Sequence, residues 1–231
     1  MEKPIPIPRN QTALMQHMQR LVSAGHYFWT TDCIPKAKLA GLIDKWSGYG
    51  LRADAPARAY RKSRGRASVH LCLEPAAANA DMECITWWML SSAGKAGLQD
   101  AVTPGQVHDA RRQEGRLRVG EYELIEHTKI VPSGQKTKKL TTWTWRLTTP
   151  RYKAWEALLI DSAKSIQGRR HLLQSIDCLR AMPMFSGVRA QVLRLLTETN
   201  RMLGKLHQPL IEIATLPIMR MVKLWNDEQR C

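Results

Sequence analysis

The sequence contains no long hydrophobic run, although 44% of its 231 residues are hydrophobic. No stretch approaches the roughly 20 apolar residues that a membrane-spanning helix needs. The opening residues 1–9 are interrupted by three prolines and contain no apolar signal core. We therefore expect a cytoplasmic protein without a membrane partner.

Cysteine is scarce and widely spaced. The five cysteines, at positions 33, 72, 84, 178 and 231, form no C-x-x-C pair, which argues against a disulfide framework or a zinc knuckle. His70 and Cys72 would point to the same side of one strand, and Cys84 could lie opposite on a neighbour. Those residues would hold zinc only with a fourth ligand, and the alternative is that the thiols fill the core. We predict no metal and no cofactor.

The motifs of common catalytic sites are also missing. The sequence has no phosphate-binding G-x-x-x-x-G-K-[ST], no H-E-x-x-H and no G-x-S-x-G. A nuclease stays open as an alternative, because a metal-independent one needs only an acid and a base near a phosphodiester. The candidates for those two roles are His26, His127 and Tyr27. A metal-dependent nuclease would instead use Glu121, Glu123 and Glu126.

Positive charge is what the sequence has in excess. It contains 35 Lys and Arg against 20 Asp and Glu, a formal net charge of +15. Such an excess favours a polyanionic partner, and residues 58–66 concentrate it as five cations without an acid. We predict basic loops that contact nucleic acid, whereas the alternatives are solvated surface loops or a scaffold for an acidic protein. The candidate contacts are Arg58, Arg61, Lys62, Arg64, Arg66, Arg111, Arg112, Lys136, Lys138, Lys139, Arg189 and Arg194.

The hydrophobic periodicity predicts an α+β fold. Helical spacing follows Asn10 and again follows Pro35, and alternation with a period of two dominates residues 51–149. The segment 84–91 is apolar on both faces, so we place it in the middle of a mostly antiparallel sheet of at least four strands. Helical spacing returns at residue 150 and predicts four helices, the last over 210–225. We predict two domains, 1–149 and 150–231, the second a basic helical bundle.

The aromatic segment His26-Tyr27-Phe28-Trp29 has two interpretations. Aromatic rings beside cations can form a stacking platform for exposed bases. Alternatively, Phe28 and Trp29 pack the first helix onto the next one.

The order of elements, the size and the charge resemble the compact large subunit of plasmid-borne type IV CRISPR effector complexes. This resemblance implies an α/β part that reads a short duplex motif and a helical part that guides a nucleic-acid strand. The resemblance assigns no role to any individual residue of this sequence. From it we expect a non-catalytic subunit of a prokaryotic mobile-element or CRISPR-type ribonucleoprotein that binds duplex DNA, guide RNA or both, together with other protein subunits.

Overall fold

A computed structural model describes residue 5 and residues 7–75, 83–103, 105–133, 136–165, 168–213 and 216–225, except for the side chains of 129–139. The elements in the described part are, in chain order, α1 (Gln11–Ser23), β1 (Phe28–Pro35), η1 (Lys36–Lys38), α2 (Leu39–Ser47), α3 (Ala55–Ser63), β2 (Val69–Leu73), β3 (Cys84–Ser91), α4 (Leu98–Ala101), β4 (His108–Asp109), β5 (Arg118–Val119), β6 (Tyr122–Ser133), β7 (Lys136–Leu147), α5 (Thr149–Lys164), α6 (Arg169–Arg180) and α7 (Ser186–Lys205). Helices and antiparallel strands occur together, so the predicted α+β class is confirmed.

The chain forms two compact units. Unit 1 contains residues 1–117, 126–143 and 221–231, and unit 2 contains residues 118–125 and 144–220. The division passes through β6 and β7, so each unit is discontinuous in sequence. In the described part of the chain, no helix combines the length and the apolar character that crossing a membrane requires.

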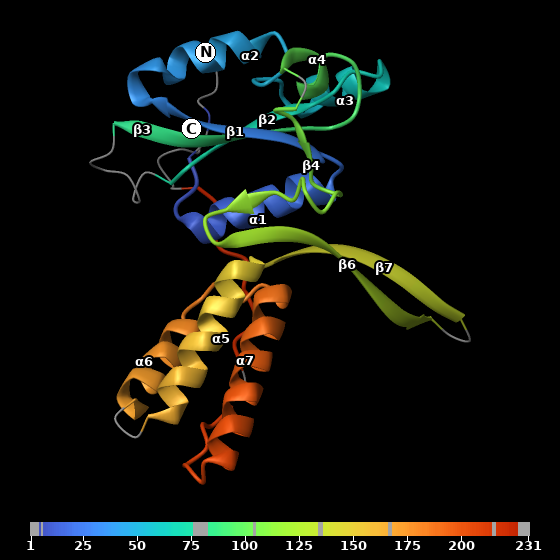
Figure 1. Ribbon diagram of the computed structural model, residues 1–231. Coiled ribbons are helices and arrows are strands. Elements are labelled where there is room, and N and C mark those ends of the chain that lie inside the picture. The colour runs from blue at the N-terminus through green and yellow to red at the C-terminus, as the bar shows by residue number, and fades with distance from the viewer. Residues whose placement is uncertain are drawn as a thin grey trace. The chain divides into compact units, whose positions relative to one another are not determined.

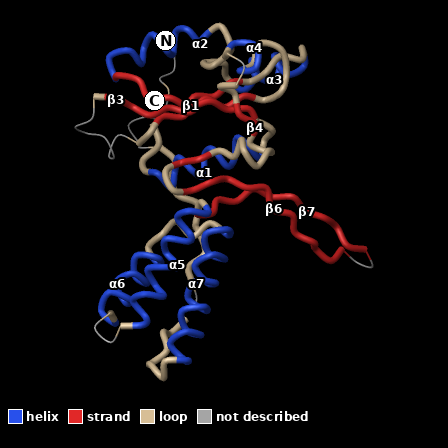
Figure 2. The backbone as a smooth tube through the Cα atoms, in the orientation of Figure 1, coloured by secondary structure: helices blue, strands red, loops and turns tan. Residues whose placement is uncertain are grey.

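Unit 1 is built around a sheet with the strand order β2-β3-β1-β4 (Figures 1 and 2). One sheet face packs against α2 and α4, with Trp46 and Leu98 among the buried contacts. The other face meets α1, whose Leu14 and Met18 are almost completely buried. Asn10 begins α1 as predicted, because its side-chain oxygen accepts a hydrogen bond from the Ala13 amide at 2.9 Å. The sheet therefore has a covered apolar layer on each side.

Strand β3 occupies the central position that its sequence predicted. It pairs with β2 through Leu71 opposite Met89, and with β1 through Thr30 opposite the same Met89. Trp87 and Trp88 point to opposite faces and both are buried. A strand that is apolar on both faces is stable only when both faces are covered.

The strands do not all belong to one sheet. The segments around Tyr122 and Trp143 lie in a separate sheet with the order β5-β6-β7. The second neighbour of β3 is β1, a strand that sequence reasoning missed because its middle is polar and exposed. Only Trp29 and Thr30 of β1 are buried, which leaves no clear alternation to recognise.

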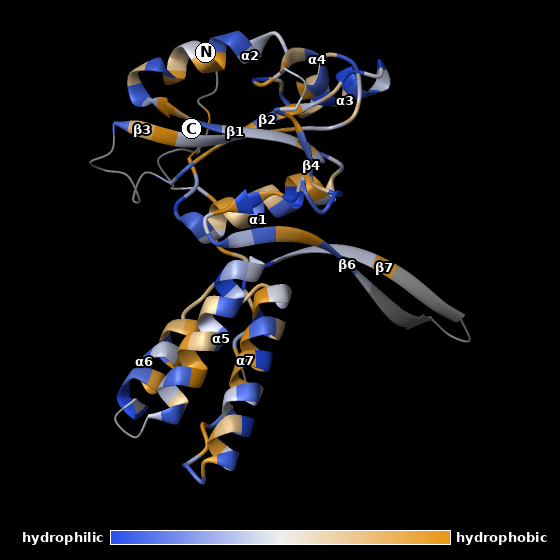
Figure 3. Cartoon of the chain, viewed as in Figure 1, coloured by the Kyte–Doolittle hydropathy of each residue, from blue (hydrophilic) through white to orange (hydrophobic). Residues whose placement is uncertain are grey.

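In unit 2, helices α5, α6 and α7 pack with the adjoining ends of β6 and β7. Hydrophobic and hydrophilic residues alternate around these helices, as Figure 3 shows. The start of α7 binds β7 closely, because the Thr144 hydroxyl accepts hydrogen bonds from the Ser186 hydroxyl at 2.8 Å and the Gly187 amide at 3.0 Å. Gly187 is required there, since a Cβ atom would lie 2.5 Å from the Trp145 carbonyl oxygen.

The predicted helix over 210–225 is wrong. The described residues after α7 are not helical, and Pro209 and Pro217 cannot donate the amide hydrogen bonds that a helix uses. Side chains bind this segment instead. Asn200 accepts from the Ile211 amide and donates to its carbonyl, each at 2.8 Å. Ile211 and Leu216 are buried, so the segment packs on unit 2 in an irregular conformation.

Candidate nucleic-acid interface

The basic stretch predicted as a loop is mostly the helix α3. Asp54 caps its N-terminus, with the carboxylate accepting from the Ala57 amide at 2.9 Å. Six of its nine residues are Ala, Arg or Lys, and these residue types have high helix propensity. The helix ends before Gly65, which has the positive φ of 67° that favours glycine. No residue of α3 is buried. Its sequence therefore has no periodic apolar face from which a helix could be predicted.

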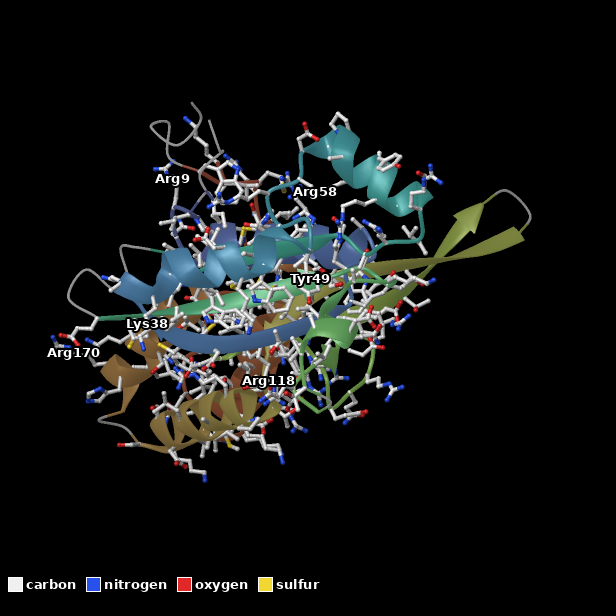
Figure 4. All side chains as sticks on the ribbon, turned by 90° about the horizontal axis from the view of Figure 1, so that it is seen from above. Arg9, Lys38, Tyr49, Arg58, Arg118 and Arg170 are labelled. Atoms are coloured by element: carbon white, nitrogen blue, oxygen red, sulfur yellow. The ribbon has the colours of Figure 1, made fainter. Side chains whose placement is uncertain are left out.

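Two arginines of α3 bind the backbone of unit 1. Arg61 donates from Nη2 to the Tyr49 carbonyl at 2.8 Å and from Nε to the Ala67 carbonyl at 3.3 Å. Arg58 donates from Nη2 to the Leu51 carbonyl at 3.3 Å, and burial lowers its pKa. Figure 4 labels Arg58, which belongs to the N-terminal half of α3, and Tyr49, whose carbonyl accepts from Arg61. These contacts give Arg58 and Arg61 structural roles at the junction between α2, α3 and β2.

The other cations of this stretch are exposed, and the fold adds one more. Lys62, Arg64 and Arg66 point to solvent, as sequence reasoning predicted for the whole run. The exposed Lys95 joins them, because its amide donates to the Gly65 carbonyl at 2.9 Å and its carbonyl accepts from the Ala67 amide at 2.8 Å. We call Lys62, Arg64, Arg66 and Lys95 the α3 basic surface. In the described part of the chain, no carboxylate forms an ion pair with any of them.

Sequence reasoning missed Lys95, although its neighbourhood carries one signal. Gly94 has φ 133°, and a Cβ atom there would lie 2.8 Å from both the Ala67 nitrogen and the Gly65 oxygen. Only glycine permits so close a backbone approach. The glycine before Lys95 is thus the sequence signal for this backbone contact. The contact could not be predicted from it, because the partner segment lies about 30 residues earlier in the chain.

An exposed aromatic ring accompanies these cations. Tyr60 is 62% exposed, and the Arg64 guanidinium carbon lies 5.4 Å from the centre of its ring. An exposed tyrosine beside cations that lack carboxylate partners is typical of surfaces that bind phosphates and bases.

Arg111 and Arg112 follow β4 in unit 1. Arg111 forms a two-point contact with Asp109, from Nε to Oδ1 at 2.9 Å and from Nη2 to Oδ2 at 2.7 Å. These hydrogen bonds lower the pKa of Asp109. The charge of Arg111 is thus matched locally, whereas Arg112 is exposed beside a pocket that also contains Phe28 and Glu114.

The remaining predicted cations lie elsewhere in the chain. Arg189 of α7 donates to the Leu216 carbonyl at 3.3 Å, and Arg194 on the same helix is exposed. Three more belong to β7, with side chains outside the described part: Lys136, Lys138 and Lys139. Nothing in the structure adds these residues to the α3 basic surface.

The possible zinc ligands do not come together. Cys72 pairs with Trp88 of β3, whereas Cys84 lies four residues before Trp88 on the same strand and pairs with Pro35. Burial raises the pKa of Cys72 to about 12, so its thiol stays protonated. Within the described residues, no group of three His, Cys, Asp or Glu side chains could hold a metal ion.

Two of the three carboxylates proposed for a metal-dependent nuclease, Glu121 and Glu123, already have partners. The buried Glu123 accepts hydrogen bonds from Arg146 at 2.6 and 2.7 Å, and Glu121 pairs with Arg151 at 2.7 Å. Each carboxylate therefore neutralises an arginine of unit 2.

His26, one of the two histidines considered as a catalytic acid or base, belongs to a cluster of histidines in unit 1. His26 meets His70 edge to face at 4.6 Å between ring centres, and its Nδ1 lies 2.9 Å from the Leu21 carbonyl oxygen. Burial and the nearby Arg58 lower the pKa of His70 to about 2, and burial and Arg20 lower that of His17 to about 4. These histidines are neutral at physiological pH, which disfavours the imidazolium form that a general acid needs.

The chain stands apart in every comparison with known proteins. It matches no family model, no curated protein and no solved structure. The case for a function therefore rests on the geometry and charge of the α3 basic surface.

Proposed function

We propose that the protein is a non-catalytic nucleic-acid-binding subunit of a prokaryotic ribonucleoprotein, in a mobile element or a CRISPR-type defence system. The observation that carries this proposal is the α3 basic surface, where Lys62, Arg64, Arg66 and Lys95 are exposed and form no ion pair with a carboxylate of the described residues. The layout and charge, which resemble the large subunit of type IV CRISPR complexes, suggest the class of complex.

The exposed cations fit a phosphate backbone physically. Each can neutralise a phosphate and release a condensed counterion without first breaking an internal ion pair. Binding of duplex DNA releases about 0.9 counterion for each phosphate contact. Four contacts therefore predict a slope of about −3.6 for log affinity against log salt.

Salt titration of duplex DNA and structured RNA tests this proposal. The wild-type protein should show a slope near −3.6 on the duplex, and replacing all four cations with alanine should bring it close to zero. A matched variant replaces four exposed cations of unit 2, namely Lys153, Arg170, Arg194 and Lys205. That variant should keep the slope. A wild-type slope near zero would remove the proposal.

The non-catalytic part is tested separately. Labelled RNA and DNA should remain intact during incubation with the protein, with or without divalent metal. Cleavage that disappears in a His26→Ala variant would show a nuclease instead.

A further inference from the structure

The planar guanidinium group of Arg111 is held in a fixed position at the β4 edge of the unit 1 sheet. The guanidinium carbon of Arg111 lies 4.7 Å from the ring centre of Tyr27 and 5.6 Å from that of Phe28. Its edge is bound by both oxygens of Asp109. The ring contacts and the two hydrogen bonds together fix the plane of the guanidinium before any ligand arrives.

Much of this side chain is still accessible. The Arg111 side chain is 48% exposed, whereas that of Asp109 is only 14% exposed. Because Asp109 already neutralises the charge, the accessible part is better suited to stacking than to binding a phosphate. Guanidinium planes are established partners for unstacked bases in single-stranded nucleic acid.

A pocket of about 350 Å³ adjoins the same loop. Its lining includes the aromatic residues Phe28 and His108 and the charged residues Arg112 and Glu114. Trp29 supports this wall from the core, with its ring 4.8 Å from His108 and its Nε1 donating to the Gly115 carbonyl at 2.7 Å. Aromatic walls with a few polar groups at the rim are typical of sites for planar ligands.

Glycine at position 115 makes this arrangement possible. A Cβ atom there would lie 2.4 Å from the Asp109 carbonyl oxygen, so the loop closes against β4 only with glycine. The closure brings Glu114 and Arg112 to the pocket that Phe28 lines.

We propose that Arg111 and the adjoining Phe28–His108 pocket bind one unpaired nucleobase of a single-stranded nucleic acid, with the base stacked on the guanidinium plane. This inference rests on the proposed function and adds a site for a single strand, distinct in its residues from the α3 basic surface. The exposed Arg112 supplies a cation for the adjoining phosphate.

The variant Arg111→Lys tests the site, because lysine keeps the positive charge but has no planar group. Affinity for an eight-nucleotide single strand should fall about 5- to 150-fold, the range expected for one lost stacking contact. Arg170→Lys makes the same exchange at an exposed position of unit 2, outside both proposed sites, and should change that affinity less than twofold. Equal affinities for the Arg111→Lys variant and the wild-type protein would overturn the inference.

Changing the ligand gives a second measurement, whose wild-type half does not depend on how the variant folds. With the wild-type protein, an abasic site at the bound position should weaken binding about 5- to 150-fold. With Arg111→Lys, the same abasic site should have less than a twofold effect. An equal loss in both proteins would show that the base does not meet Arg111. Matched RNA and DNA strands then show whether the ribose 2′-hydroxyl contributes.

The outcomes separate this inference from the proposed function. The base site alone is wrong if duplex binding has a slope near −3.6 while the single-strand affinity is the same for Arg111→Lys and the wild-type protein. If the wild-type protein binds neither duplex nor single strand, both proposals are wrong.

Discussion

Helix α3 in unit 1 and the helices of unit 2 are both rich in cations, but those cations have different partners. The arginines of unit 2 that bind carboxylates or backbone carbonyls include Arg146, Arg151, Arg169, Arg180, Arg189 and Arg201. Within the described residues 58–66, the arginines bound in this way are Arg58 and Arg61. An excess of positive charge therefore does not locate an interface, and the partners of each cation are more informative.

The largest expected effect lies in unit 2. Arg146→Ala removes a guanidinium that lies 2.6 Å from Glu123, whose side chain is only 6% exposed, and so weakens the compensation of a buried negative charge. We expect the free energy of unfolding to fall by about 3 kcal/mol, measured by denaturant titration. The control is Arg151→Ala, which breaks the exposed pair with Glu121 and should change stability by less than about 1 kcal/mol. Equal losses would show that burial does not distinguish the two pairs.

The histidine cluster should make unit 1 the acid-sensitive unit. The folded-state pKa values of His17 and His70 are lowered to about 4 and about 2, so the unfolded chain binds more protons below pH 6.5. Their contribution to stability is present above pH 6.5 and decreases as the pH falls toward 4. We expect about 2 kcal/mol to be lost between pH 6.5 and about 5.5.

Hydrogen exchange checks this loss for each unit separately. Amides of α1 and β2 should lose protection at pH 5 relative to pH 7, after correction for the intrinsic exchange rate, and those of α7 should not. The variant His17→Gln should reduce the pH dependence. Equal loss of protection in both units would contradict the assignment to the cluster.

Arg61 and Lys62 are neighbours in α3, but only the first has a structural role in our account. Arg61→Ala removes hydrogen bonds to the Tyr49 and Ala67 carbonyls, and we expect it to lower stability by about 1.5 kcal/mol. Lys62→Ala should change stability by less than about 0.5 kcal/mol but reduce the steepness of the salt dependence by about 0.9. If Lys62→Ala destabilises the protein and leaves the slope intact, the division into structural and binding cations is wrong.

The smallest effect concerns the cap of α3. Asp54→Ala should lower stability by about 1 kcal/mol, because the Ala57 amide loses its side-chain acceptor. Asp54→Asn keeps a capping oxygen, removes a negative charge and should be nearly neutral. Thermal unfolding of the two variants tests whether the basic segment is held as a helix. Equal melting temperatures would argue against that.

The sequence predicted the elements whose burial leaves a periodic pattern. The two apolar faces of the 84–91 segment indicated a central strand, and Asn10 marked the start of α1. It did not predict β1, whose polar middle is exposed, or the irregular chain around Pro217, which depends on side chains such as Asn200. Local patterns carry no information about contacts made by distant side chains.

The candidate site was predicted in part for the same reason. The density of cations in residues 58–66 identified the stretch but not which side chains bind carbonyls. Lys95 joins the α3 basic surface because its backbone pairs with residues 65–67, and this pairing is visible only in the folded protein. Whether the predicted cations bind nucleic acid stays a prediction.

The most direct test is the salt slope on duplex DNA for two variants that each lose four positive charges. One variant neutralises the α3 basic surface and the other neutralises Lys153, Arg170, Arg194 and Lys205 of unit 2. We predict a slope near zero for the first and about −3.6 for the second. Equal slopes would show that the protein binds through net charge alone, and the reverse order would place the interface on unit 2.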